Sequence, residues 1–290
     1  MDRASFTELL TELRPSLHRY CARMTGSVID GEDVVQAALE RALEAFDRDP
    51  PAENPGGWVF RVAHNATLDF LRRRARERVH AASEEASQMT EHGLSADSRV
   101  ALAASLRTFL RLPVSQRSSV LLMDVLGHSL EEIADITGLS VLAVKAALHR
   151  GRSSLRIFAA EPVETPEPSL DSSQRALLQA YVDRFNAHDF DAVREMLAEE
   201  VRLEVVARAR MRGRKEVQTY FHNYSDRADW LLAPGLVEGR PAALALDPAR
   251  PEGAVLYFVL LGWEGDRLLT VRDFRHARYA VDSADVVRLG

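Results

Sequence analysis

Hydrophobic residues recur at helical spacing through the first part of the chain. In SFTELLTELRPSLHRYCARM, residues 5–24, one face carries Phe6, Leu9, Leu10, Leu13, Leu17 and Tyr20. A second stripe follows, with Asp30 as its expected N-cap, and it consists of Val34, Val35, Ala38, Leu39, Ala42 and Phe46. The proline- and glycine-rich stretch DRDPPAENPGG, residues 47–57, precedes a third predicted helix. Residues 1–78 therefore predict a helical bundle.

Two polar segments divide the rest of the chain. Residues 79–98, VHAASEEASQMTEHGLSADS, have no hydrophobic period and predict a flexible tether. A compact helical block is expected over residues 99–160. The three prolines of EPVETPEPSLDSS prevent that block from continuing as a helix and predict a second linker at residues 161–170.

The pattern changes in residues 171–290. A helical stretch, QRALLQAYVDRFNAHDFDAVREML, leads into the strand-like VRLEVVARA, residues 201–209. Further on, AVLYFVLLGWEGDRLLTVRDF contains an apolar β-rich run, a turn at Gly265-Asp266 and a second strand, which predicts a hairpin. A helix followed by strands is typical of an α+β domain.

The charge balance limits how the protein can bind nucleic acid. The 290 residues have a formal net charge of −6, divided into −1 for residues 1–160 and −5 for the remainder. DNA binding would therefore depend on local basic patches. The single cysteine, Cys21, excludes an internal disulfide and a cysteine-cluster zinc site. The chain has no apolar run of about 18 residues and does not begin like a signal peptide, so we expect a cytoplasmic protein with no membrane partner.

The segment LEEIADITGLSVLAVKAALHRGR, residues 130–152, has the spacing of a helix-turn-helix. Gly138 supplies the turn, Ser140 can cap the second helix, and the expected inward positions are Leu130, Ile133, Ala134, Ile136, Val141, Val144 and Leu148. The outward face could reach base edges and phosphates in a major groove through Lys145, Ala146, His149, Arg150 and Arg152. By spacing alone, two packed helices with a solvated basic face explain the same pattern.

Two blocks in order resemble the extracytoplasmic-function (ECF) sigma factors, the minimal promoter-specificity subunits of bacterial RNA polymerase. The first, DGEDVVQAALERAL with GGWVFRVAHNATLDFLRRRARE, is similar to region 2 of that family. The second, LRLPVSQRSSVLLMDVLGHSLEEIADITGLSVLAVKAALHRGRSSLR, is similar to region 4. The resemblance implies two all-α domains that bind core RNA polymerase and promoter DNA. Because it implies recruitment and strand opening rather than covalent chemistry, no catalytic residue, cofactor or metal is expected.

The resemblance assigns roles to side chains of the first block. In the family, the helix that here carries Asp33, Val34 and Gln36 docks on the clamp helices of the polymerase. The third helix captures and melts the −10 element in the family, and the corresponding residues here are Trp58, Arg61, Asn65, Asp69, Arg72 and Arg73. An aromatic ring can stack on an unpaired base, an amide can read its edge, and arginines suit phosphates. From the residues alone, a core tryptophan and a solvated charge run explain the same positions.

In the second block, Lys145, Ala146, His149 and Arg150 occupy positions that read the −35 element in the family, with Arg152 beside them. The resemblance adds Leu130 and Glu131 from the preceding helix, and Arg117 is expected to contact a phosphate. Family members often carry a hydroxyl and an arginine where this chain has Ala146-Ala147. The −35 specificity is therefore expected to differ from that of relatives.

The last part resembles SnoaL-like domains, the cone-shaped α+β fold shared with ketosteroid isomerases. FNAHDFDAVREMLAEEV, residues 185–201, carries the resemblance as a helix, a polar break, a second helix and a strand, and VRDFRHARYAV is similar to the last strand of that fold. Some relatives transfer protons with an Asp/His pair, for which the candidates here are His188, Asp189, His222, Asp229, Asp273 and His276. Because nothing in the sequence places two of them across one cavity, a regulatory role is preferred, through contact with the sigma part or a small ligand.

Three functions remain open at this point. The first is an ECF sigma factor whose SnoaL-like domain modulates activity in cis. The second is a one-component transcriptional regulator with a ligand-binding C-terminal domain, which would not need the Asp33 and Gln36 block or the Trp58–Arg78 helix. The third is a SnoaL-like isomerase or cyclase. Sigma factors with this fusion form a group with a proline-containing motif before region 4 and a glycine-rich loop in the appended domain. RLPVSQ and ARARMRGRKEV depart from both motifs here, which leaves the details of cis control open.

Overall fold

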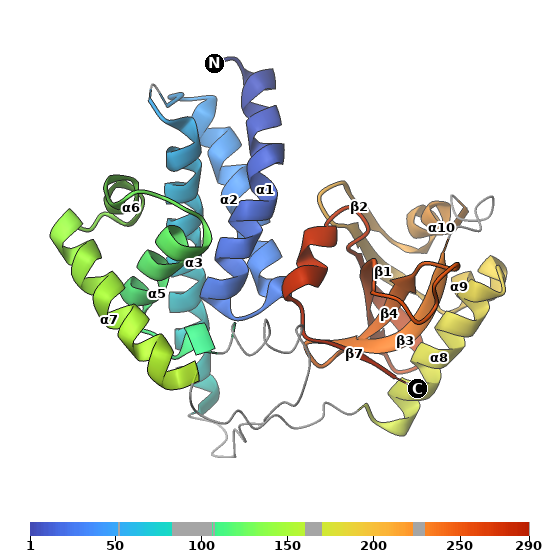
Figure 1. Ribbon diagram of the computed structural model, residues 1–290. Helices are drawn as coiled ribbons and strands as arrows, with labels where there is room; N and C mark the ends of the chain where they lie inside the picture. Colours follow the sequence, from blue (N-terminus) through green and yellow to red (C-terminus); the bar gives the residue numbers. More distant parts are fainter. Residues whose placement is uncertain (52, 83–105, 107, 160–169, 223–229, 290) are drawn as a thin grey trace. The chain divides into compact units, whose positions relative to one another are not determined.

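The structure is a computed structural model that describes residues 1–51, 53–82, 106, 108–159, 170–222 and 230–289 (Figure 1). The chain forms two compact units, Met1–Pro166 and Glu167–Gly290. Most of the predicted tether, residues 83–98, and nearly all of the predicted second linker, residues 161–169, lie outside the described residues.

Three long helices open the first unit: α1 (Arg3–Thr25), α2 (Val28–Phe46) and α3 (Pro55–Ala82). They pack side by side around a common apolar core, in which the rings of Phe6 and Phe46 stack with centroids 4.2 Å apart (Figure 1). The helix α3 continues to Ala82, past the predicted boundary at residue 78.

The junction of α1 and α2 corrects one prediction from the sequence. The chain leaves α1 at Gly26, whose φ of 79° is in the left-handed region that glycine adopts without strain. Ser27 then caps α2, because its hydroxyl accepts a hydrogen bond of 3.1 Å from the backbone N–H of Asp30. Asp30, the expected N-cap, lies instead in the first turn of α2 and pairs with Arg74 of α3. A glycine in α2, Gly31, lets the two helices approach closely.

The second part of this unit is also helical. It consists of α5 (Val114–Val120), a π-helical turn η1 (Leu121–Val125), α6 (Leu130–Thr137) and α7 (Val141–Ala159). Helices α6 and α7 form the predicted helix-turn-helix. Ser129 and Glu132 make a reciprocal capping box at the start of α6, Gly138 turns the chain with a φ of 74°, and Ser140 accepts from the backbone N–H of Ala143.

In the second unit, the described residues contain a seven-stranded sheet in the order β2-β1-β6-β5-β4-β3-β7. Its strands are β1 (Leu197–Val205), β2 (Ala209–Arg212), β3 (Leu231–Val237), β4 (Arg240–Leu246), β5 (Tyr257–Glu264), β6 (Arg267–Asp273) and β7 (Val286–Arg288). Every neighbouring pair is antiparallel except β1 and β6, which run parallel. The predicted hairpin is confirmed as β5 and β6, and Gly265 in its turn has a φ of 58°.

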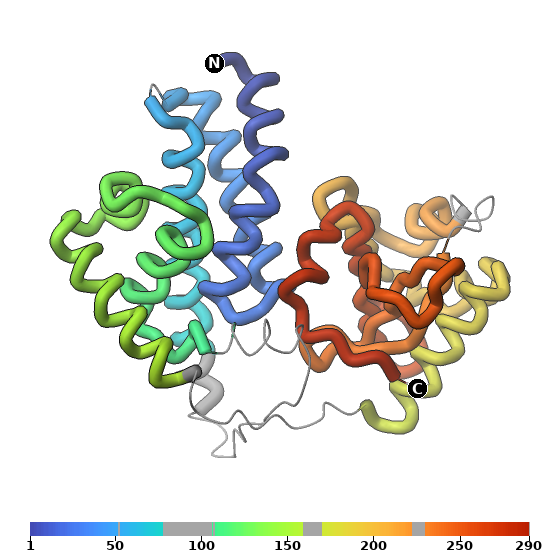
Figure 2. Tube along the Cα trace, in the orientation of Figure 1, coloured from blue at the N-terminus to red at the C-terminus, as the bar shows by residue number. Residues whose placement is uncertain are grey.

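The helices of this unit are α8 (Ser172–Asn186), α9 (Phe190–Glu195) and α10 (Arg214–His222), with a 3-10 turn η2 (Arg278–Ser283). Figure 2 shows α8 and α10 on one side of the sheet and the η2 segment on the other. Apolar side chains on the helix side, such as Leu203, Val259 and Val271, form the core. The expected last strand, VRDFRHARYAV, is wrong beyond Asp273, because the chain turns there into η2 and the last strand is β7.

Candidate nucleic-acid interface

One face of α3 carries most of the residues proposed for the −10 element. Arg61, Asn65 and Asp69 follow one another at about one-turn spacing, and all three are exposed. Trp58, one turn earlier, is half-buried and lies against Phe6 of the core, with ring centroids 6.1 Å apart. The exposed face therefore offers a guanidinium and an amide, whereas the indole packs within the bundle.

The basic end of α3 is partly neutralised by its own acids. Asp69 accepts from Arg72 at 3.1 Å and lies 3.5 Å from Arg41 of α2. Arg73 lies 3.8 Å from Glu77. The side chains of Arg72 and Arg73 are nevertheless 67% and 63% exposed to solvent. Exposed ion pairs of this kind are weak, so both guanidiniums are available to a phosphate.

The proposed polymerase-docking residues of α2 have different environments. Asp33 is exposed. Gln36 is half-buried, where its side chain accepts from Arg14 at 3.0 Å and donates to Glu40 at 2.8 Å. Val34 is 3% exposed and belongs to the core of the bundle, so its side chain supports the helix rather than presenting a docking surface.

The second helix of the helix-turn-helix, α7, presents a basic outer face. Lys145, His149, Arg150 and Arg152 are exposed. A groove of about 410 Å³ runs along this face and is lined by Met123, Leu130, Lys145, Leu148, His149, Arg152 and Arg156. Arg152 makes a two-point ion pair with Asp124, which fixes α7 against η1.

The alanines of α7 differ from each other. Ala146 is half-buried, but Ala147 is only 2% exposed and lies in the core. Of the two positions where the chain departs from the family that it resembles, only Ala146 is near the surface that could meet DNA. On α6, Leu130 is half-buried beside the groove and Glu131 is exposed.

Arg117 differs most from its expected role as a phosphate contact. This residue of α5 is 6% exposed, and its guanidinium donates to the backbone carbonyls of Met24, Leu110 and Leu112. Burial lowers the pKa of the guanidinium because desolvation disfavours the charged form. Since Met24 belongs to α1, Arg117 joins the two helical parts of the first unit, and in this arrangement it does not reach solvent.

The −10 face of α3 and the helix-turn-helix lie against each other. Arg61 and Asn65 line a cavity of about 370 Å³ whose other wall is the segment 134–139, from α6 through the turn. Beside it, the rings of Phe60 and His128 meet edge to face with centroids 4.8 Å apart. The side chains predicted to capture the −10 element thus face the helix-turn-helix that is predicted to bind the −35 element.

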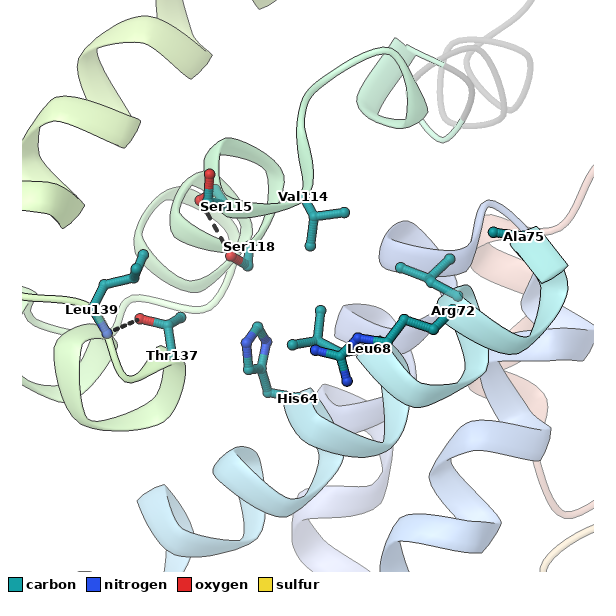
Figure 3. A pocket seen from close by; sticks show the side chains of 10 residues that line it. His64, Leu68, Arg72, Ala75, Val114, Ser115, Ser118, Thr137 and Leu139 are labelled. Carbon is teal, nitrogen blue, oxygen red and sulfur yellow. Dashed lines mark hydrogen bonds between the residues drawn. The ribbon is translucent and has the colours of Figure 1, made fainter.

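A second cavity, of about 610 Å³, lies next to the first between α3 and α5 (Figure 3). Its wall is mainly apolar, with Leu68, Leu71, Val114 and Leu139, and His64 points into it. Burial lowers the pKa of the His64 imidazole to about 4, so this side chain is neutral at physiological pH. Sequence reasoning gave no role to His64, because a single histidine on an apolar stripe has no distinguishing pattern.

Among the acid/base candidates of the second unit whose side chains the structure describes, only Asp273 is buried. Its carboxylate accepts from the Tyr220 hydroxyl and from the backbone N–H of Arg275, both at 2.8 Å. Asp189 caps α9 and, like His188 and His276, is exposed. The side chain of His222 and all of Asp229 lie outside the described residues. Tyr220 was not predicted, since it lies 53 residues from its partner in sequence.

Among the described residues, no cluster of His, Cys, Asp and Glu could hold a metal ion, and no helix is long and apolar enough to cross a membrane. The arrangement offers binding groups for nucleic acid: two exposed faces, each with cations and hydrogen-bonding side chains, on α3 and α7. Both belong to the first unit.

Comparison with known protein families agrees with this arrangement. Sigma-70 region 2 matches residues 9–77, Sigma-70, region 4 matches residues 105–155, and a SnoaL-like domain matches residues 178–259. Two sigma regions on two packed helical parts define a transcription initiation factor that binds DNA. The described α+β fold of the second unit agrees with the third match.

Curated relatives identify the family. ECF RNA polymerase sigma factor SigG of Mycobacterium tuberculosis is 28% identical over 277 residues, which cover 83% of this chain and 73% of the relative. SigW of Bacillus subtilis is 30% identical over 166 residues, which cover 53% of this chain and 89% of the relative. The chain belongs to the ECF RNA polymerase sigma factors. The predicted fold class and the prediction of a sigma factor with a SnoaL-like domain are confirmed.

Solved structures with a similar chain include the M. tuberculosis ECF sigma factor SigJ, with 20% identity and a TM-score of 0.37, covering 91% of this chain and 94% of that one. The sigma factor RpoE of Bartonella quintana, solved in complex with the anti-sigma factor NepR, has 22% identity and a TM-score of 0.45. The match with RpoE covers 53% of this chain and 96% of the RpoE chain.

Proposed function

We propose that this sigma factor recruits core RNA polymerase through α2, with Asp33 and Gln36, and holds promoter DNA with two separate helices. On α3, the residues that contact the −10 element are Arg61, Asn65, Arg72 and Arg73, with Asp69 orienting Arg72. On α7, Lys145, His149 and Arg150 contact the −35 element. The observation that carries this assignment is the exposure of these side chains on the two helices that match the sigma regions.

Three further residues that the sequence assigned to DNA have supporting roles in this proposal. Trp58 braces the start of α3 through its contact with Phe6. Arg152 positions α7 through Asp124. Arg117 holds the two helical parts together through the Met24 carbonyl. Each acts on the orientation of a DNA-binding helix instead of touching DNA in this arrangement.

In this proposal the first unit is in a closed arrangement, in which the helix-turn-helix lies against the face of α3 that carries Arg61 and Asn65. Across a cavity of about 370 Å³, the segment 134–139 faces Arg61 and Asn65, where a promoter strand along α3 would lie. The −10 and −35 elements lie apart along the duplex, so α3 and α7 must separate before both can bind. Docking of α2 on the polymerase supplies the free energy for this opening.

The SnoaL-like unit modulates this activity in cis and has no catalytic role in the proposal. This is supported by the hydrogen bonds of Asp273, the one buried carboxylate among the described candidates, whose oxygens already accept from the Tyr220 hydroxyl and from the backbone N–H of Arg275. A carboxylate held in this way is a structural tie rather than a free general base. The unit acts by contact with the sigma part or through a small ligand.

Transcription in vitro with core polymerase tests the proposal. The full chain and a chain ending at Ala160 are compared on promoter DNA, together with the variants Asn65→Ala and, as a control in the second unit, Arg175→Ala. We expect the full chain to initiate transcription specifically at the promoter. The rate of initiation should fall at least tenfold with Asn65→Ala and stay unchanged with Arg175→Ala. Failure of both chain lengths to initiate would contradict the assignment, and equal activity of the two would remove the cis role of the second unit.

A further inference from the structure

The face of the sheet turned away from α8 and α10 is divided into two halves. Over β5, β4 and β3, this face is buried beneath the η2 segment, and its residues include Phe258, Leu244 and Ala242. Over β2, β1 and β6, the corresponding residues are polar. They are Arg202 and Glu204 of β1, Arg210 and Arg212 of β2, and Thr270 and Arg272 of β6.

The register brings these side chains into rows. Arg202 lies directly opposite Arg212 and beside Thr270, whereas Glu204 lies between Arg210 and Arg272. Glu204 pairs with both neighbours, at 3.2 Å with Arg210 and at 2.5 Å with Arg272. Four arginines and one carboxylate on three adjacent strands leave this half of the face with a net positive charge. We call these six residues the basic face.

The pair of Arg202 and Arg212 is unfavourable within the sheet itself. Directly opposite residues on antiparallel strands have Cβ atoms about 5 Å apart, so two like charges there destabilise the pairing. Both side chains are exposed, and β2 is an edge strand of the sheet. A bound anion that contacts both guanidiniums would relieve this repulsion.

We propose that the basic face binds the phosphate backbone of duplex DNA, so that the SnoaL-like unit contacts the promoter together with the sigma helices. Guanidiniums pair with phosphate oxygens in a planar, two-point geometry. Arg210 and Arg212, two residues apart on one strand, lie about 7 Å apart along it and extend the contact in one direction. The net charge of −5 on residues 161–290 means that this attraction is local to the face.

Two other occupants fit the basic face less well. Binding of single-stranded nucleic acid depends on aromatic side chains that stack on bases, and none of the six residues of the basic face is aromatic. A second copy of the chain, related by a two-fold axis over this face, would set arginines against arginines. The inference rests on the proposed function in one respect, that the chain works on promoter DNA.

Salt dependence of DNA binding tests the proposal. The full chain is titrated against a fluorescent duplex without promoter elements, and anisotropy is measured as the salt concentration is raised. Arg202→Glu with Arg212→Glu is compared with a charge-matched control, Arg175→Glu with Arg250→Glu. We expect the first pair of substitutions to reduce the slope of log K against log salt by about 1.8, since each lost phosphate contact removes about 0.9. The control is expected to leave the slope near that of the original chain.

The variant Arg212→Thr gives a second readout. Removing one of two opposed cations is expected to raise the melting temperature of the second unit while weakening DNA binding. In the salt titration, equal slopes for the original chain and both doubly substituted variants would overturn the proposal. An equal decrease of the slope in both doubly substituted variants would do the same. So would unchanged DNA binding with a loss of affinity for core polymerase, which would assign the basic face to an acidic protein surface. Because the duplex has no promoter elements, these results are independent of whether the chain initiates transcription.

Discussion

Two buried histidines in the first unit are neutral because of burial. His18 donates from Nε2 to the Val28 carbonyl at 2.9 Å, and His64 Nδ1 shares a hydrogen bond of 2.6 Å with the Tyr20 hydroxyl. Burial lowers the pKa of both imidazoles from the ordinary 6.5 to about 4. The folded unit therefore resists protonation at sites where the unfolded chain accepts a proton.

The first unit is predicted to lose stability as the pH falls from 6.5 towards 4. In this window the unfolded chain binds more protons than the folded chain, so the free energy of unfolding decreases. At pH 5, each histidine is expected to cost about 2 kcal/mol relative to pH 7. Urea unfolding at both pH values measures the change, and His64→Gln should remove about half of it. A free energy of unfolding that is equal at pH 5 and pH 7 would contradict the prediction.

At the residue scale, sequence reasoning identified exposed side chains better than buried ones. Lys145, His149 and Arg150 were expected at the surface and lie there. Arg117 was expected at the surface as well, because an arginine in a helical pattern gives no sign that carbonyls of another helix surround it. Ala147 was grouped with Ala146 for a similar reason: the spacing of small residues does not show which one reaches the core.

The helix α7 is predicted to divide its contacts between bases and phosphates. Replacing His149 or Arg150 with Ala is expected to cost about 1–3 kcal/mol in −35 binding and to relax sequence preference. Replacing Lys145 with Ala is expected to weaken binding to all sequences and to lower the salt slope by about 1. Holoenzyme binding to a set of −35 variants measures both effects. Arg175→Ala, an exposed arginine of α8 outside the sigma part, is the control, and an effect as large as that of Arg150→Ala would count against base contacts.

The helices α1 and α2 are predicted to depend on Gly31 for their close approach. A Cβ at this position would lie 2.6 Å from backbone atoms of Ala22, so Gly31→Ala forces the helices apart despite its better helix propensity. We expect a loss of about 2 kcal/mol, as for other overpacked sites. Gly56→Ala in α3 is the matched control, because its Cβ would meet no atom within 3.9 Å. Thermal unfolding should show a lower melting temperature for the first and an unchanged or higher one for the second.

At the scale of elements, local pairings were predictable and distant ones were not. The β5–β6 hairpin was expected from Gly265-Asp266, since two strands joined by a short turn pair with each other. The parallel pairing of β1 with β6 joins strands that are far apart in sequence, and periodicity contains no information about it. The segment after Asp273 was expected to be a strand, but it leads into η2, in which Ala280 is buried together with the N-cap residue Ala277.

On the scale of the whole molecule, the closed first unit is predicted to limit activity. The contact of His128 with Phe60 joins the helix-turn-helix to α3, and edge-to-face ring contacts of this kind contribute about 0.5–1.5 kcal/mol. His128→Ala should therefore raise the open fraction, and with it the apparent affinity for core polymerase, by about two- to tenfold. Competition binding against the original chain measures this ratio. A lower affinity, with unchanged helical content, would show that the closed arrangement does not oppose polymerase binding.

The pairing of β1 with β6 also sets an order of events during synthesis. The sigma part is complete when Ala159 has left the ribosome, but the sheet of the second unit cannot close until β6 has followed, roughly a hundred residues later. At translation rates of 5–20 residues per second, this delay is about 5–20 s. Each new molecule therefore passes through a period in which a folded sigma factor exists without its appended domain, and any restraint exerted by that domain begins only after this interval.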